Sequence, residues 1–222
     1  MQYLYHPDSS SPLLELREDS HRYIFKIRRH RVGEMVKLRN LEDDKLYSYV
    51  IKNIDKQKTV LSLKDSELSI VESEKKLHVC WCIVDPKSIE KILPTLNEIG
   101  VDKITFVYCE RSQRSFKLDF SRLEKIILNS SQQSGRSRLM KLETVESLEV
   151  FVSKHPNSKL LNFSEHNFIS DMDIDTIIVG CEGGFCPDEV ALFDPSHIVG
   201  LRTSLVLRAE SAVAVIASKI LL

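Results

Sequence analysis

The sequence has little glycine, little proline and a single tryptophan. Its 222 residues include 7 Gly, 7 Pro and 1 Trp, and 42% of them are apolar. These proportions exclude collagen-like and low-complexity chains and are typical of a globular protein. No apolar run approaches the length that spans a bilayer. Met1–Pro12 has neither a basic nor an apolar segment, so we expect no signal peptide, no membrane partner and a cytoplasmic location.

Cysteine is also scarce, and its spacing does not fit a metal site. The 5 cysteines include a C-x-C pair, Cys80 and Cys82, and a five-residue step from Cys181 to Cys186. A structural zinc site usually needs closer pairing such as C-x2-C. The histidines supply no pair four residues apart, so we predict no metal.

Net charge is nearly absent as well, at −1 from 31 basic and 32 acidic residues, but the charges are segregated. His21–Arg39 holds seven basic residues against one acidic residue, and Arg111–Lys141 holds eight against two. Leu142–Gly200 reverses the balance, with two lysines and eleven acidic residues. Such polarity indicates a polyanion partner. The alternative is that these runs are only solvated faces.

The first seventy residues have the pattern of short strands separated by polar turns, which predicts a small β-barrel. A charged, Ser- and Glu-rich stretch then suggests a domain boundary near residue 72. The expected strands are Tyr3–Tyr5, Tyr23–Ile27, Met35–Leu38, Leu46–Ile54 and Thr59–Leu63.

After the boundary, strands alternate with helices, which predicts an α/β domain with a largely parallel sheet. A capping box, Ser121 with Glu124, opens one of the helices. The expected strands are Leu77–Val84, Ile104–Tyr108, Lys159–Asn162 and Thr176–Val179, and the expected helices are Lys87–Ile99, Ser121–Gln133, Pro187–Phe193 and Arg208–Leu222.

The most distinctive local feature is a glycine-rich loop between the strand at Thr176–Val179 and the helix at Pro187. Gly180, Gly183 and Gly184 lie here, where ligands of open α/β sheets bind. Glu182 and the acidic first turn of the helix disfavour phosphate. A neutral or cationic ligand fits better, and a plain strand-to-helix turn is the alternative.

Two further stretches combine charge with small or polar residues. In the final helix, small residues allow close packing against a sheet or a second subunit, and Arg208 and Glu210 either pair with each other or line a site. In Ser130–Arg138, two arginines follow a helix and could bind phosphate. Gly135 there is equally explained as a helix C-cap.

In this order, the motifs resemble the RsmE family of 16S rRNA uridine-N3 methyltransferases, of the SPOUT class. The matching stretches cover most of the chain: Arg29 with Gly33-Glu34, Asn97–Val101, Glu110–Ser112, Gln133–Arg136, Val179–Phe185 and Val206–Ala212. Three positions depart from the family's usual residues, with Cys181 in place of proline and Ala209 and Ser211 in place of threonines. The glycine usual just before Val206 is also missing.

The resemblance implies a PUA-like RNA-binding barrel at 1–70 and a SPOUT methyltransferase domain at 74–222, with a trefoil knot over about 160–222. It also implies a homodimer that uses S-adenosylmethionine to methylate N3 of a specific uridine in 16S rRNA, on the 30S subunit. The cofactor-binding residues it implies are Leu161, Asn162, Gly180, Cys181, Glu182, Gly183, Gly184, Val206, Leu207, Arg208, Glu210 and Ala212.

Catalytic and RNA-binding roles complete these expectations. Arg136 is expected to hold phosphate or the negative charge that develops on the uracil, and Glu182 or Glu210 to act as the base. The expected RNA-binding residues are Arg22, Arg28, Arg29, Arg31, Arg111, Arg114, Arg136 and Arg138. The alternatives are a non-catalytic RNA-binding or ribosome-assembly factor on the same fold and an α/β enzyme that acts on a small anionic metabolite.

Overall fold

The computed structural model describes residues 2–165, 167–169 and 172–222. It divides the chain into two compact units. The first unit comprises Met1–Glu72 and Leu128–Leu139, and the second comprises Ser73–Ile127 and Met140–Leu222. Among the described residues, no helix has both the length and the apolar character needed to cross a bilayer.

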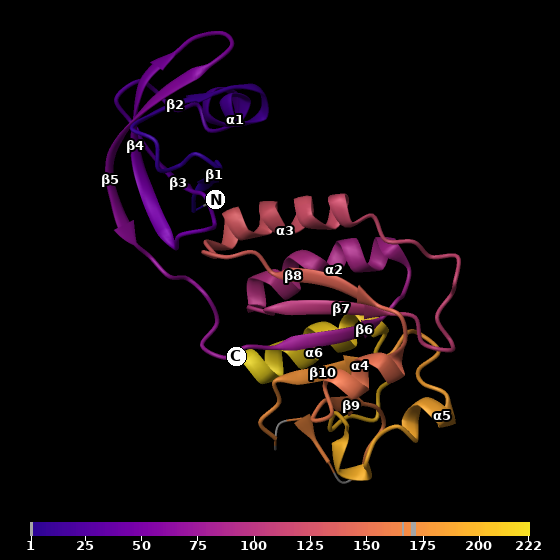
Figure 1. Ribbon diagram of the computed structural model, residues 1–222. Coiled ribbons are helices and arrows are strands. Elements are labelled where there is room, and N and C mark those ends of the chain that lie inside the picture. Colours follow the sequence, from indigo (N-terminus) through magenta and orange to yellow (C-terminus); the bar gives the residue numbers. More distant parts are fainter. Residues whose placement is uncertain (1, 166, 170–171) are drawn as a thin grey trace. The chain divides into compact units, whose positions relative to one another are not determined.

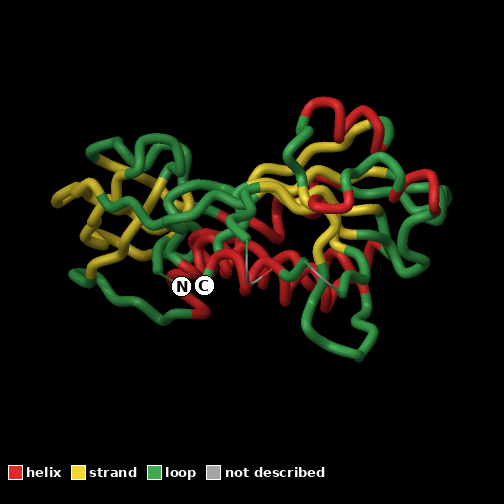
Figure 2. The backbone as a smooth tube through the Cα atoms, turned by 90° about the horizontal axis from the view of Figure 1, so that it is seen from below, coloured by secondary structure: helices red, strands yellow, loops and turns green. Residues whose placement is uncertain are grey.

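The sheet of the first unit is curled (Figure 2). It is open, with the strand order β1-β3-β4-β5-β2. All neighbouring strands are antiparallel except β1 and β3, which are parallel. Its strands are β1 (Leu4–Tyr5), β2 (Leu13–Leu16), β3 (Met35–Arg39), β4 (Lys45–Ile54) and β5 (Thr59–Leu68). The predicted small barrel is therefore present as a half-barrel, which leaves β1 and β2 as edges among the described residues.

One predicted strand of this unit is wrong. Tyr23–Ile27 forms a π-helix, η1, that continues α1 (Glu18–Arg22). The Arg28 amide donates to the Tyr23 carbonyl oxygen at 2.9 Å, which is the i to i+5 bond of a π-helix. Of the five residues only Ile24 is buried, so the apolar run that resembled a strand has a single inward position.

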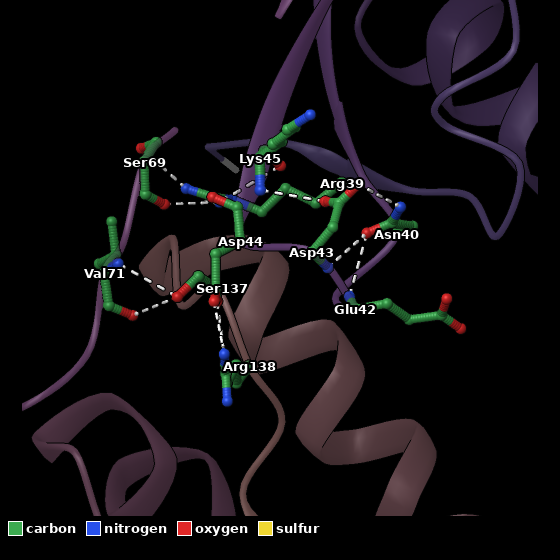
Figure 3. Close-up of polar contacts among 10 residues, drawn as sticks. All are labelled: Arg39, Asn40, Glu42, Asp43, Asp44, Lys45, Ser69, Val71, Ser137 and Arg138. Carbon is green, nitrogen blue, oxygen red and sulfur yellow. Dashed lines mark hydrogen bonds and ion pairs between the residues drawn. The ribbon is translucent and has the colours of Figure 1, made fainter. Parts of the chain in front are cut away.

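Residues 128–139 belong to the first unit, and they bond the loop between β3 and β4 and the segment after β5 (Figure 3). They include the end of α3 (Phe120–Ser134), where Gly135 has φ +93° and its amide donates to the Ser131 carbonyl, so Gly135 is a helix C-cap. Val71 and Ser137 exchange bonds, with the Ser137 amide 3.0 Å from the Val71 carbonyl oxygen. Arg138 Nε lies 2.9 Å from Asp44 Oδ1.

The second unit has a parallel sheet with the order β11-β9-β10-β6-β7-β8, which confirms the predicted α/β class (Figure 1). Its strands are β6 (His78–Cys82), β7 (Lys103–Val107), β8 (Lys141–Val145), β9 (Lys159–Leu161), β10 (Thr176–Val179) and β11 (Ile198–Val199). Its helices are α2 (Pro86–Ile99), the first part of α3, α4 (Leu148–Lys154), α5 (Pro187–Val190), the 3-10 turn η3 (Pro195–His197) and α6 (Ala209–Leu221).

Burial, one proline and one glycine explain several elements of this unit. All four residues of β10 are buried, as expected for a central parallel strand. Helix α2 begins at Pro86, where a missing N–H costs nothing, and ends at Ile99, followed by Gly100 as a left-handed cap with φ +113°. A Cβ on Gly100 would lie 2.7 Å from Ser73 Cβ, so the position requires glycine. Helix α6 packs against α2 and β10, and its buried residues are the three alanines Ala209, Ala212 and Ala217 with Val213, Ile216 and Ile220.

Two details of the predicted helices are wrong. Helix α3 begins at Phe120 because Asp119 Oδ1 accepts the Arg122 amide at 3.1 Å, so the cap is Asp119 and the predicted box of Ser121 and Glu124 does not form it. Helix α5 ends at Val190 rather than at Phe193. The trefoil knot stays a prediction of the resemblance.

Candidate functional site

A cavity of about 790 Å³ opens in the second unit, where the ends of β9 and β10 meet the segment that leads into α6. Its size suits a nucleoside-sized ligand. The lining residues are Leu161, Asn162, Phe163, Ser164, Glu165, Val179, Gly180, Cys181, Glu182, Gly183, Gly184, Phe185, Leu201, Thr203, Leu205, Val206, Leu207, Arg208, Ala209 and Ala212.

The loop at 180–184 forms one wall, and its glycines have identifiable roles. A Cβ on Gly180 would lie 3.1 Å from the Phe185 ring, so the ring packs directly on the backbone. Gly184 has φ +66°, and its amide donates to the Cys181 carbonyl oxygen at 2.9 Å, which closes a tight turn. An added Cβ on Gly184 would meet no atom within 4 Å, so the backbone at this glycine is open on that side.

Two side chains hold this loop in place. Glu189, only 6% exposed, accepts the Cys186 amide through Oε2 at 2.9 Å and the Glu110 amide through Oε1 at 2.8 Å. Arg111 Nη1 donates to the Gly183 carbonyl oxygen at 2.7 Å. The loop after β7 is thereby bonded both to the glycine loop and to α5.

The second and third walls come from the segments after β9 and before α6. The Asn162 amide donates to the Val199 carbonyl oxygen at 2.9 Å, which fixes the first of these segments against β11. Sequence reasoning named Leu161 and Asn162 in this wall but missed Phe163 and Leu205, which are 81% and 73% exposed. Exposed apolar side chains beside a cavity are a signal of binding, but exposure cannot be deduced from the sequence.

Of the cofactor-binding residues that the resemblance implies, the structure places all except Glu210 on this cavity. Glu210 lies in the first turn of α6, half-buried, and is not among the described lining residues. The charged lining residues are Glu165, Glu182 and Arg208. Two carboxylates with one guanidinium fit a ligand that carries both a cation and a carboxylate.

The candidate catalytic residues are distributed over both units. Glu182 is exposed and lines the cavity of the second unit. Arg136 belongs to the first unit, is only 7% exposed, and its carbonyl oxygen accepts the Tyr3 hydroxyl at 2.8 Å. Burial leaves little of its guanidinium surface for direct contact with an RNA phosphate.

The predicted RNA-binding arginines differ in how free their guanidinium groups are. Arg22, Arg28, Arg29 and Arg31 are exposed in and after α1 and η1. Arg138 instead forms a bidentate ion pair with Asp44 (Figure 3). The carboxylate offsets the charge of Arg138 within the first unit.

Arg111 and Arg114 are exposed on the loop after β7 in the second unit. Arg111 bonds the Gly183 carbonyl, and the Arg114 guanidinium lies 5.4 Å from the centre of the Tyr108 ring.

Comparison with known proteins identifies the class of protein to which this fold and cavity belong. Residues 71–221 match the model of the RNA methyltransferase domain family, so the chain is an RNA methyltransferase by class. It is 35% identical, over 98% of both chains, to ribosomal RNA small subunit methyltransferase E of Helicobacter pylori. It is 26% identical to the Rickettsia conorii protein of the same name, over 90% of this chain and 85% of the relative. The chain belongs to the ribosomal RNA small subunit methyltransferase E family, RsmE.

Solved structures agree over nearly the whole chain. A Legionella pneumophila protein in complex with the bound cofactor SAM superposes with a TM-score of 0.82 at 25% identity, over 99% of this chain and 96% of the other. Ribosomal RNA small subunit methyltransferase E from Neisseria gonorrhoeae, bound to S-adenosyl methionine, superposes with a TM-score of 0.81 at 19% identity, over 98% and 96%. Because the Neisseria gonorrhoeae protein is only 19% identical, its similarity shows that the fold is shared.

Proposed function

We propose that the protein transfers a methyl group from S-adenosylmethionine to N3 of a specific uridine in 16S rRNA, within the small ribosomal subunit. The observation that carries this proposal is the cavity, because the two loops that family resemblance assigns to the cofactor converge on it. Membership of the RsmE family along 98% of the chain supports the choice of substrate. We further propose a cytoplasmic homodimer, an RNA-binding unit at 1–70 and a knotted methyltransferase domain at 74–222.

The lining of the cavity fits S-adenosylmethionine. When bound, this cofactor supplies a methyl group on a cationic sulfonium. Val206 and Leu207 offer apolar contact for a flat base, and the turn at 180–184 offers backbone groups. Glu165 and Glu182 favour a cation, and Arg208 favours a carboxylate.

The chain's own residues must position the uracil and remove its N3 proton. The N3 proton lies on the Watson–Crick edge, so the uridine has to be unpaired or flipped. We propose Glu182 as the base because its carboxylate lies on the cavity, with Glu210 as the alternative. Arg136 is only 7% exposed, so we propose that it stabilises the negative charge on the uracil oxygens rather than holds a phosphate.

Methylation assays on 30S subunits from a strain that lacks the protein test both roles. We expect Glu182→Gln and Arg136→Ala each to lower turnover by about 100-fold or more, which is the usual contribution of an acid–base group and of a charge-stabilising donor. Asp188→Asn is the matched control, because Asp188 lies in the first turn of α5 and is not among the lining residues. Near wild-type turnover in both variants would overturn the assignment.

Two measurements test the activity itself. Calorimetry should show that the reduced wild-type protein binds S-adenosylmethionine. Mass spectrometry of rRNA from the deletion strain should show one lost methyluridine, restored by the wild-type gene. Binding without any lost methyluridine would instead indicate a non-catalytic factor.

A further inference from the structure

Three buried thiols lie where β6, β7 and β10 end, beside the glycine loop. Cys82 is the last residue of β6, and Cys109 and Cys181 each lie two residues beyond their strands. The Sγ atoms of Cys109 and Cys181 are 3.5 Å apart, and Cys109 Sγ is 3.1 Å from Ser112 Oγ. Cys109 and Cys181 are free thiols, 1% and 6% exposed.

One member of this pair belongs to the wall of the cavity. Cys181 is one of the residues that line the cavity that we assign to the cofactor. Cys186, the most exposed of the five cysteines, is not among the lining residues. Cys181 also stands at one of the positions that depart from the family's usual residues.

Neighbouring groups shift the pKa values of the two thiols in opposite directions. Hydrogen bonds from Cys181 and from Cys82 lower the pKa of Cys109. The pairing with Cys109 raises the pKa of Cys181, and burial raises it further. Cys109 is therefore the member of the pair that loses its proton more readily, and the thiolate is the nucleophile in thiol oxidation.

We propose that Cys109 and Cys181 form a thiol pair that hydrogen peroxide oxidises to a disulfide, and that this modification blocks the cofactor cavity. The thiolate attacks one peroxide oxygen, the O–O bond breaks, and the departing hydroxide takes up a proton to give water and a sulfenic acid. The second thiol then attacks the sulfenic sulfur, the S–S bond forms, and hydroxide leaves with the thiol proton as water. Two thiols lose two electrons, and one peroxide is reduced to two waters.

A disulfide between Cys109 and Cys181 would move the wall of the cavity. A disulfide needs an S–S separation of about 2.05 Å, so oxidation draws the two sulfurs together by about 1.5 Å from their 3.5 Å separation. Cys181 begins the turn that ends at Gly184, so the wall of the cavity must move with it. The effect on cofactor binding rests on the proposed function, whereas formation of the disulfide does not.

The test treats the full-length protein with hydrogen peroxide, blocks the remaining thiols, and maps cross-linked peptides by mass spectrometry. We expect a peptide that joins Cys109 to Cys181 and a loss of at least tenfold in S-adenosylmethionine affinity by calorimetry. Dithiothreitol should remove the joined peptide and restore the affinity. S-adenosylhomocysteine at saturation should slow the oxidation, because it covers Cys181. Cys109→Ser should resist the loss of affinity, and the matched control Cys186→Ser should behave as wild type.

The outcomes separate the two proposals. No Cys109–Cys181 peptide, or a cross-linked protein with unchanged affinity, overturns the inference. If Cys109→Ser does not fold, the peptide map and calorimetry of the wild type still decide. If the reduced wild type does not bind S-adenosylmethionine, the proposed function fails, and the peptide map alone decides whether the pair forms a disulfide.

Discussion

One hydrogen bond joins the loop after β7 to the wall of the cavity. Arg111 Nη1 donates to the Gly183 carbonyl oxygen at 2.7 Å, and the aliphatic stem of Arg111 packs against Gly183, where an added Cβ would lie 3.1 Å from Arg111 Cβ. The sequence predicted Arg111 only as an RNA-binding residue. At residue scale, this arginine positions the loop that we assign to the cofactor.

Arg111→Met should therefore weaken S-adenosylmethionine binding by about fivefold, because a net hydrogen bond of this kind contributes about 1 kcal/mol. The KM for S-adenosylmethionine should rise while kcat stays near wild type. Arg114→Met is the matched control, since Arg114 lies on the same loop with its guanidinium over Tyr108. Equal cofactor affinities in the two variants would contradict the positioning role.

At the scale of elements, the sequence predicted best those segments whose periodicity is set by burial. The strand at Thr176–Val179 and the start of a helix at Pro187 were predicted correctly, because four successive buried residues and an N-terminal proline are local signals. The edge strand β8 was missed because much of it is exposed. Tyr23–Ile27 was predicted wrongly because a short apolar run has no period of its own.

The candidate site shows the same limit. The glycine loop could be named from the sequence because its glycines and the acidic residue Glu182 mark it, whereas the segment before α6 was named through the family resemblance. Their convergence on one cavity, and the bond from Arg111, depend on contacts between residues more than twenty positions apart. The sequence carries no local signal of such contacts.

Strands β6 and β7 share a polar network that should make stability depend on pH. His78 Nε2 lies 2.7 Å from Thr105 Oγ1, which donates to Glu143 Oε1 at 2.7 Å. Burial, with Lys103 and His155 nearby, lowers the pKa of His78 from 6.5 to about 4. The unfolded chain therefore binds more protons between these values, so the free energy of unfolding should fall as the pH drops from 6.5 towards 4.

Urea unfolding at pH 7 and pH 5 measures this effect. We expect the wild type to lose stability at pH 5 and His78→Gln to lose clearly less. His197→Gln, a change in the short turn η3, serves as the control and should keep the wild-type dependence. A wild-type dependence in His78→Gln would show that other groups control acid stability.

At the scale of the whole molecule, the net charge of −1 is the sum of units with different charge patterns. Part of the first basic block is structural, because Arg39 is 2% exposed and donates to the Ser69 carbonyl oxygen at 2.8 Å. Arg28, Arg29 and Arg31 of that block are exposed, and Arg28 bonds the Tyr23 hydroxyl through Nε. The acidic residues Glu165 and Glu182 line the cavity of the second unit.

Replacing Arg28, Arg29 and Arg31 together by Glu should therefore weaken binding to the 30S subunit and spare S-adenosylmethionine affinity. Each lost phosphate contact removes a released counterion, so the plot of log affinity against log salt should become shallower by about 2 for three contacts. Lys75, Lys87 and Lys91 are exposed in the second unit, and their joint change to Glu alters net charge equally. If both triple variants lose the same affinity and slope, net charge alone governs RNA binding and the first unit has no dedicated RNA surface.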